Sequence, residues 1–156
     1  MRRVLVAVSL AALAGCGPST VAKPAPSAPP AAAQIDVAAM QARIAMLEAP
    51  YNEAQFDAGR RVFAQCRSCH TVNEGGANRL GPNLYGVFGR EIGTVSGFAY
   101  SQPVKDADFT WDAAQLDHWL ENPRTFLPGN RMAFAGVRDA AQRRDLIAYL
   151  MVSSSE

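Results

Sequence analysis

The sequence predicts an all-α fold. Three segments carry apolar residues at helical spacing, namely 54–65, 112–121 and 139–151. The strict alternation of apolar and polar residues that is typical of half-buried strands is nearly missing from the sequence. Between the helical segments lie two stretches rich in Gly and Pro, 75–99 and 122–136, which are longer than ordinary connections. Loops of that length make sense if they wrap a bound group rather than a core made of protein alone.

The chain of 156 residues has room for one domain of ordinary size, which we expect at 51–156. From Tyr51 onward it carries 11 basic and 12 acidic side chains and no block of basic residues. None of the sequence signatures of nucleic-acid binding is present, so we expect no nucleic-acid partner. A domain this small buries a limited core, and a large flat cofactor at its centre would add much apolar contact.

The first residues have the features of an export signal. Two arginines precede an apolar run that extends to Gly15 and is too short to span a bilayer. The run ends in the four residues LAGC, which resemble the lipobox of bacterial lipoproteins. The resemblance implies a signal peptide at 1–15, a lipid on Cys16, and a place on the periplasmic side of a bacterial membrane, inner or outer. The alternative is an ordinary signal peptide with Cys16 near its cleavage site by chance.

A linker and a short helix complete the segment 16–50. Residues 17–34 contain five Pro and no aromatic residue, so they predict an extended tether. As polyproline II they would reach ~55 Å at ~3.1 Å per residue. Asp36 can cap a helix whose apolar residues share one face: Val37, Met40, Ile44 and Leu47. This helix either packs on the domain or serves for docking or dimerisation, and Pro50 closes it.

The run Cys66-Arg67-Ser68-Cys69-His70 indicates the chemistry of the domain. Two thiols three residues apart on a helical turn can each add to one vinyl group of the same haem, and the histidine can then ligate the iron. This predicts one covalently attached haem c. A structural zinc site would need a fourth ligand, and no second Cys pair follows. A thioredoxin-like pair normally lies in a βαβ pattern, which is missing, and a chance match is the remaining alternative.

The second axial ligand must come from elsewhere in the domain. Met132 follows a Pro-Gly break, so a loop could lay its thioether against the iron. Such a neutral sulfur ligand raises the reduction potential relative to two histidines. Met151 lies in an apolar helical run and is expected to pack on the core. His118 follows a helix start at Asp112 and is expected on the surface of that helix.

From about residue 53 to residue 153 the chain resembles a class I cytochrome c of the mitochondrial and bacterial type. Gly59 and Phe63 in FDAGRRVFAQC resemble the N-terminal helix of the family, and DLIAYL at 145–150 resembles its C-terminal helix. The resemblance implies that these helices cross at those residues and that loops wrap one haem, leaving one haem edge near solvent. It also implies that Met132, in PGNRMAF, is the iron ligand.

The segment GPNLYGVFGR resembles the loop that follows the haem motif in the family. The resemblance implies that the carbonyl oxygen of Pro82 accepts a hydrogen bond from His70, which would fix the ring and raise its basicity. Tyr100, Trp111 and Arg90 stand where the family places groups around a buried haem propionate. Donors and positive charge are needed there, because a buried carboxylate is costly without them.

Two features depart from the family. Trp119 stands where the family usually has a Tyr whose hydroxyl bonds to the Met sulfur, and indole can only donate and is bulkier. We therefore expect a different Met geometry or reduction potential. The mitochondrial members surround the haem edge with lysines, whereas the folded part of this chain has only Lys105. A smaller positive rim could come from arginines, namely Arg67, Arg79, Arg124 and Arg131.

The sequence thus predicts a membrane-tethered, exported mono-haem cytochrome c that shuttles single electrons. With both axial positions filled, by His70 and Met132, the iron has no open site, so we expect no enzyme. The resemblance implies respiratory partners such as a quinol–cytochrome c reductase and a terminal oxidase. One alternative is a peroxidase-like or ligand-sensing haem protein in which Met132 dissociates. Another is a haem subunit that docks into a larger complex through the helix at 37–47.

Overall fold

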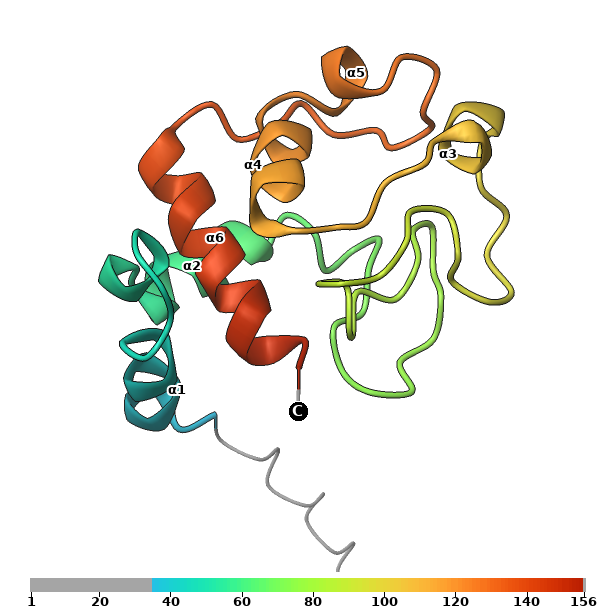
Figure 1. The fold of residues 1–156 in the computed structure, drawn as a ribbon. Coiled ribbons are helices and arrows are strands. Elements are labelled where there is room, and N and C mark those ends of the chain that lie inside the picture. The colour runs from blue at the N-terminus through green and yellow to red at the C-terminus, as the bar shows by residue number, and fades with distance from the viewer. Residues whose placement is uncertain (1–34, 156) are drawn as a thin grey trace, which may run out of the picture. The chain divides into compact units, whose positions relative to one another are not determined.

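Two crossing helices, α2 (Phe56–Phe63) and α6 (Ala140–Ser153), organise the computed structural model (Figure 1). The structure describes residues 35–155, so the predicted signal peptide, Cys16 and the linker 17–34 lie outside the described residues. A Cβ atom at Gly59 would overlap the Asp145 carbonyl oxygen and lie 2.6 Å from Cβ of Tyr149. Only glycine allows the two backbones to approach so closely. The predicted crossing is confirmed.

Aromatic and aliphatic side chains fill the space around this crossing. The ring of Tyr149 lies 5.3 Å from that of Phe56 and 5.1 Å from that of Phe63, between centroids. Leu146 and Ile147 on α6 are fully buried. Such tilted ring pairs contribute packing beyond the area that they bury.

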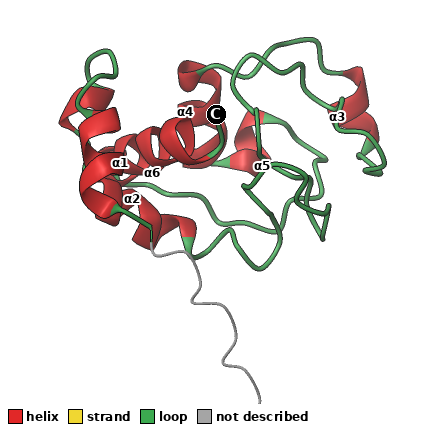
Figure 2. Ribbon diagram, turned by 90° about the horizontal axis from the view of Figure 1, so that it is seen from below, coloured by secondary structure: helices red, strands yellow, loops and turns green. Residues whose placement is uncertain are grey.

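Helix α1 (Val37–Ile44) packs on the crossing. Its N-terminus is capped as predicted, because Asp36 accepts a hydrogen bond from the Ala39 N–H at 3.0 Å. Ile44 is fully buried and joins the same core, and α1 contacts both α2 and α6. Both ribbon views place α1 at the far side of the folded residues from α3 (Gln102–Asp106) (Figures 1 and 2). Of the two expectations for this helix, packing on the domain is confirmed.

Helix α4 (Ala113–Glu121) packs against α6 on another side. The predicted segments began at residues 112 and 139, and the helices begin one residue later because Asp112 and Asp139 are their N-caps. Arg143, which is buried on α6, donates to Asp117 of α4 at 2.8 Å and so ties the two helices together.

The rest of the described chain is irregular. It contains a 3-10 turn η1 (Tyr51–Glu53), the short helix α5 (Pro123–Phe126) and an isolated bridge between Glu91 and Thr110. Residues 35–155 contain no extended strand, which confirms the all-α prediction (Figure 2). Within those residues no helix is both long and apolar enough to cross a membrane.

Candidate haem site

A cavity of about 610 Å³ lies among the loops. Its walls come from both of the Gly- and Pro-rich stretches and from α4, as expected for loops that wrap a bound group. A smaller hollow of about 110 Å³ shares several of its residues, including His70, Trp119 and Met132. The larger volume is typical of sites that enclose a small organic molecule.

The Cys66–His70 segment continues directly from the end of α2. The Cys66 N–H donates to the Phe63 carbonyl at 2.8 Å, and the His70 N–H donates to the Cys66 carbonyl at 2.9 Å. These turns bring Cys66 and Cys69 to one wall of the smaller hollow, and Cys69 and His70 to the larger one. Burial, with a smaller contribution from Cys69, raises the pKa of the Cys66 thiol to about 11. A thioredoxin-like pair normally lies in a βαβ pattern, and residues 35–155 contain no extended strand, so the fold disfavours that alternative.

The ring of His70 is fixed by two neighbouring residues, Pro82 and Gly81. Its Nδ1 lies 2.7 Å from the carbonyl oxygen of Pro82, so the predicted hydrogen bond is present. Burial lowers the pKa of His70, although the bond to Pro82 opposes that shift. The neutral imidazole donates from Nδ1 and leaves Nε2 free for a metal ion. A Cβ atom at Gly81 would lie 2.6 Å from Nε2 and 2.7 Å from Nδ1, so only glycine leaves room for the ring.

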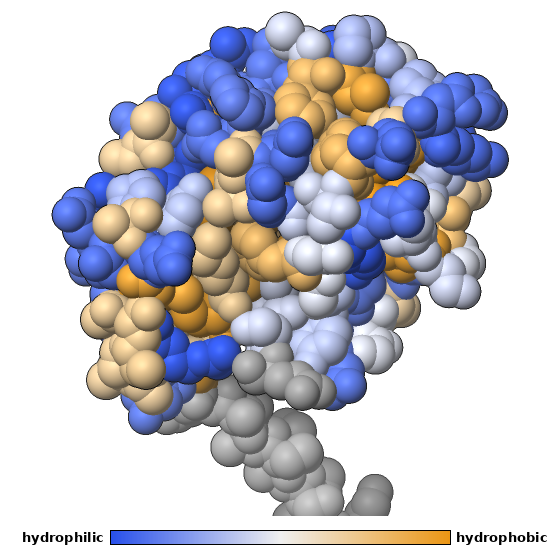
Figure 3. All heavy atoms as spheres, viewed as in Figure 1, coloured by the Kyte–Doolittle hydropathy of each residue, from blue (hydrophilic) through white to orange (hydrophobic). Residues whose placement is uncertain are grey.

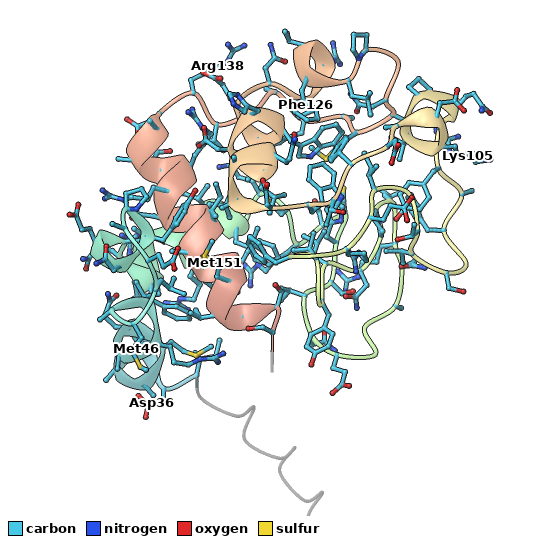
Figure 4. All side chains as sticks on the ribbon, viewed as in Figure 1. Asp36, Met46, Lys105, Phe126, Arg138 and Met151 are labelled. Carbon is cyan, nitrogen blue, oxygen red and sulfur yellow. The ribbon has the colours of Figure 1, made fainter. Side chains whose placement is uncertain are left out.

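Met132 lies in the cavity wall, on an irregular segment. It lines both hollows and is partly buried. The chain reaches it through Gly129, whose φ of 82° is a conformation that favours glycine. The rival candidates do not line either hollow. His118 is exposed on α4, and Met151 on α6 packs against the core (Figure 4).

One end of the cavity is polar. The guanidinium of Arg90 donates to the carbonyl oxygens of Tyr85 at 2.8 Å and of Asn83 at 3.1 Å. Its burial lowers the pKa of Arg90, but a guanidinium stays charged at any ordinary pH. The hydroxyl oxygen of Tyr100 accepts from the Val95 N–H at 3.3 Å, which leaves its own proton available to donate.

Ser101 adds a donor that the sequence did not indicate. Its Oγ is buried, has no hydrogen-bond partner within residues 35–155, and belongs to a residue that lines the cavity. A buried hydroxyl without a partner is unusual, and a bound acidic group would satisfy it. A serine in a loop is too common for the sequence alone to single it out.

These residues fit the haem that the sequence predicts. Gly81 leaves room for the His70 ring, and Ser101, with its unpartnered hydroxyl, lines the same cavity as Arg90 and Tyr100, where propionates would need donors. All the residues predicted to bind the haem line one or both of the two hollows: Cys66, Cys69, His70, Pro82, Arg90, Tyr100, Trp111 and Met132.

Four aromatic rings support the wall beside Met132. Trp119 packs edge-on against Trp111 at 5.6 Å and against Phe126 at 5.9 Å, between centroids. Phe109 contacts both Trp111 and Phe126. Figure 4 shows Phe126 on α5, from which its side chain reaches the interior. Trp119 is thus held in place next to the segment that carries Met132.

The mouth of the cavity carries few charges. Of the four arginines expected at a rim, Arg79 and Arg131 line the cavity, whereas Arg67 and Arg124 do not. Arg79 donates to the Arg67 carbonyl at 2.8 Å, which fixes its guanidinium. Leu80 beside it is 83% exposed. Polar and apolar residues likewise alternate over the face seen in Figure 3.

Comparisons with known proteins agree with this geometry. A family model described as cytochrome c matches residues 56–154. A cytochrome c from Chlamydomonas reinhardtii is 47% identical over 93 residues, which are 59% of this chain and 83% of the relative. A cytochrome c from Guizotia abyssinica is 41% identical over 109 residues, 69% of this chain and 96% of the relative. One from Kluyveromyces lactis is 38% identical over 106 residues, 67% and 96% respectively.

Proposed function

Since the chain belongs to the cytochrome c family and is thus a mono-haem electron carrier, not an enzyme, we propose that His70 and Met132 are the axial ligands of its one covalent haem c. The observation that carries this proposal is that both residues line the same two hollows, beside Cys66 and Cys69. When bound, the haem supplies reversible one-electron chemistry. The protein contributes an imidazole held by Pro82 and a thioether held in its loop.

The polar end of the cavity would hold the haem propionates. Arg90 supplies positive charge, and Tyr100 and Ser101 supply hydroxyl donors. Trp111 closes this part of the wall through its ring contacts with Phe109 and Trp119. A carboxylate in this environment is stabilised by charge-assisted hydrogen bonds rather than left unpaired.

Carbon monoxide binding tests the proposed ligand pair. A ferrous haem with both axial positions filled does not take up carbon monoxide readily, whereas Met132→Ala opens one position and should bind it. The ferric protein should also show a sulfur-to-iron charge-transfer band that Met132→Ala loses. Ready carbon monoxide binding by the unaltered protein, with no such band, would instead favour the peroxidase-like alternative.

The tether rests on the sequence. The LAGC run at Cys16 supports lipidation, and several acyl chains on one residue anchor a protein firmly. The domain would then work on the periplasmic side of a bacterial membrane. In cells, Cys16→Ser should move the protein from the membrane fraction to the soluble fraction and abolish labelling with a fatty-acid analogue. Membrane retention of the unlabelled variant would refute the lipid anchor.

The partners would be respiratory complexes, a quinol–cytochrome c reductase as donor and a terminal oxidase as acceptor. Anchoring donor, carrier and acceptor to one membrane replaces diffusion in volume by a local search at high effective concentration. The near-neutral domain and the two rim arginines support weak electrostatic steering. Reduction of the protein by membranes that oxidise added quinol should therefore depend little on salt. The same membranes should reduce Met132→Ala more slowly than the unaltered protein.

A further inference from the structure

The side chain of Asn130 joins α5 to Met132. Its Nδ2 donates to the carbonyl oxygens of Pro123 and Leu127, each at 2.8 Å. Its Oδ1 accepts a hydrogen bond from the Met132 N–H at 2.9 Å. One partly buried side chain therefore binds the first residue of α5, the residue after its end, and the residue that enters the cavity.

Met132 needs such support because its own segment is irregular. Residues 131–139 form neither helix nor strand, and a tight turn follows in which the Phe134 N–H donates to the Met132 carbonyl at 3.0 Å. Fixing a residue in an irregular segment costs conformational entropy that no helix or sheet offsets. The three bonds of Asn130 offset part of that cost at the position where the thioether leaves the backbone.

The neighbours of Asn130 fix the loop as a whole. A Cβ atom at Gly129 would lie 3.0 Å from Cγ of Pro103, so the turn packs closely on α3. Arg131 donates to the carbonyl of Ala99, another residue that lines the cavity. Neither contact involves Met132, so the link from α5 to the Met132 backbone runs through Asn130.

We propose that Asn130 is a positioning residue for the axial ligand, which holds the backbone of Met132 so that its thioether reaches the iron. This rests on the proposed ligation by Met132. All three hydrogen bonds of the Asn130 side chain are to backbone groups. Its role is preorganisation, since a ligand held in its bound geometry loses less freedom when it binds.

Competition with added imidazole for the ferric iron tests the proposal in the haem-loaded protein. Asn130→Leu keeps the side-chain volume but removes all three hydrogen bonds. The imidazole concentration that displaces Met132 should then fall by a factor of about ten or more, as the loss of a few hydrogen bonds predicts. The sulfur-to-iron band should also disappear at a lower temperature than in the unaltered protein.

Two variants separate positioning from general stability. Asn122→Leu removes the 2.6 Å hydrogen bond from Asn122 to the Thr125 hydroxyl of the same short helix but no bond to Met132. The imidazole affinity of this variant should therefore stay unchanged. Asn130→Asp keeps the oxygen that accepts from Met132 and loses the donors to α5. It should fall between Asn130→Leu and the unaltered protein, and it serves as the test if Asn130→Leu fails to mature.

Each outcome decides between the claims. The positioning role alone is overturned if Asn130→Leu binds imidazole no more tightly than the unaltered protein, or if Asn122→Leu gains as much imidazole affinity as Asn130→Leu. If the unaltered protein binds imidazole as readily as Met132→Ala does, Met132 is not the ligand. That result overturns the proposed ligand pair, and the positioning role with it.

Discussion

Gly81 shows how one missing methyl group shapes the site. A Cβ atom there would lie 2.6 Å from Nε2 and 2.7 Å from Nδ1 of His70. Gly81→Ala must therefore shift the ring or the loop, which disturbs the hydrogen bond from Nδ1 to the Pro82 carbonyl. We expect a loss of about 1–3 kcal/mol in the free energy of unfolding, as for other overpacked sites, together with an altered axial-ligand spectrum. Urea unfolding and the ferric optical spectrum of the haem-loaded protein measure both.

Gly86→Ala is the matched control for that variant. Gly86 has a φ of 64°, which favours glycine, but nothing lies within 4 Å of the added Cβ atom. It should cost stability through backbone strain and leave the ligand spectrum unchanged. If Gly81→Ala changed stability but not the spectrum, the proposed close support of the His70 ring would be wrong.

Trp119 is the residue where the reduction potential is expected to differ from that of the family. It lines both hollows with Met132 and is held there by Trp111 and Phe126. In Trp119→Tyr a hydroxyl could donate to the Met132 sulfur, which weakens the sulfur as an electron donor and favours ferrous iron. We expect the potential to rise by a few tens of mV, the order of magnitude of one hydrogen bond. A redox titration with no shift would contradict this.

At the scale of elements, α1 is part of the fold rather than of the tether. Gln41 donates to the Ala54 carbonyl at 2.9 Å and accepts from the Phe56 N–H at 2.8 Å, so it binds the start of α2. Gln41→Leu removes both bonds and should lower the free energy of unfolding by about 1–3 kcal/mol. Gln102→Leu, which removes an exposed bond to Asp106, should change it by less than about 0.5 kcal/mol. Equal losses in urea unfolding would argue against a docked α1.

The α2–α6 crossing should respond to alkaline pH through Tyr149. Burial raises the pKa of this phenol above its usual value of 10.0. The unfolded chain therefore ionises first, and the stability contributed by the neutral phenol is present below about pH 10 and lost as pH rises through the folded-state pKa. Relative to Tyr149→Phe, the unaltered protein should lose up to about 1.4 kcal/mol per pH unit in that window. Urea unfolding of both proteins between about pH 8 and pH 11 measures the difference; parallel curves would contradict it.

For the whole molecule, the sequence predicted the regular elements well. Apolar spacing located α2, α4 and α6, and Asp36 and Asp112 marked two N-termini, because periodicity and capping are local properties of the chain. The short helices α3 and α5 were not predicted. Each has five residues or fewer, with Pro near its start, and such a turn differs little in sequence from a loop.

The sequence predicted only those site residues that belong to a recognisable motif. Cys66, Cys69 and His70 follow from their own spacing, and the resemblance to a family supplied Pro82, Met132 and the polar group around Arg90. Ser101 and Asn130 escaped both routes. A loop serine and an asparagine after Pro-Gly are ordinary turn residues in sequence. Their importance depends on what lies beside them across distant segments, namely the cavity wall for Ser101 and the backbone of Met132 for Asn130.

The central claim is that one haem c, held by His70 and Met132, carries single electrons. A redox titration of the haem-loaded protein, followed by optical and paramagnetic resonance spectra, tests it most directly. The account predicts a single one-electron step between two low-spin states, with a sulfur-to-iron charge-transfer band in the ferric form only. A high-spin ferric state without that band, or more than one electron per chain, would contradict it.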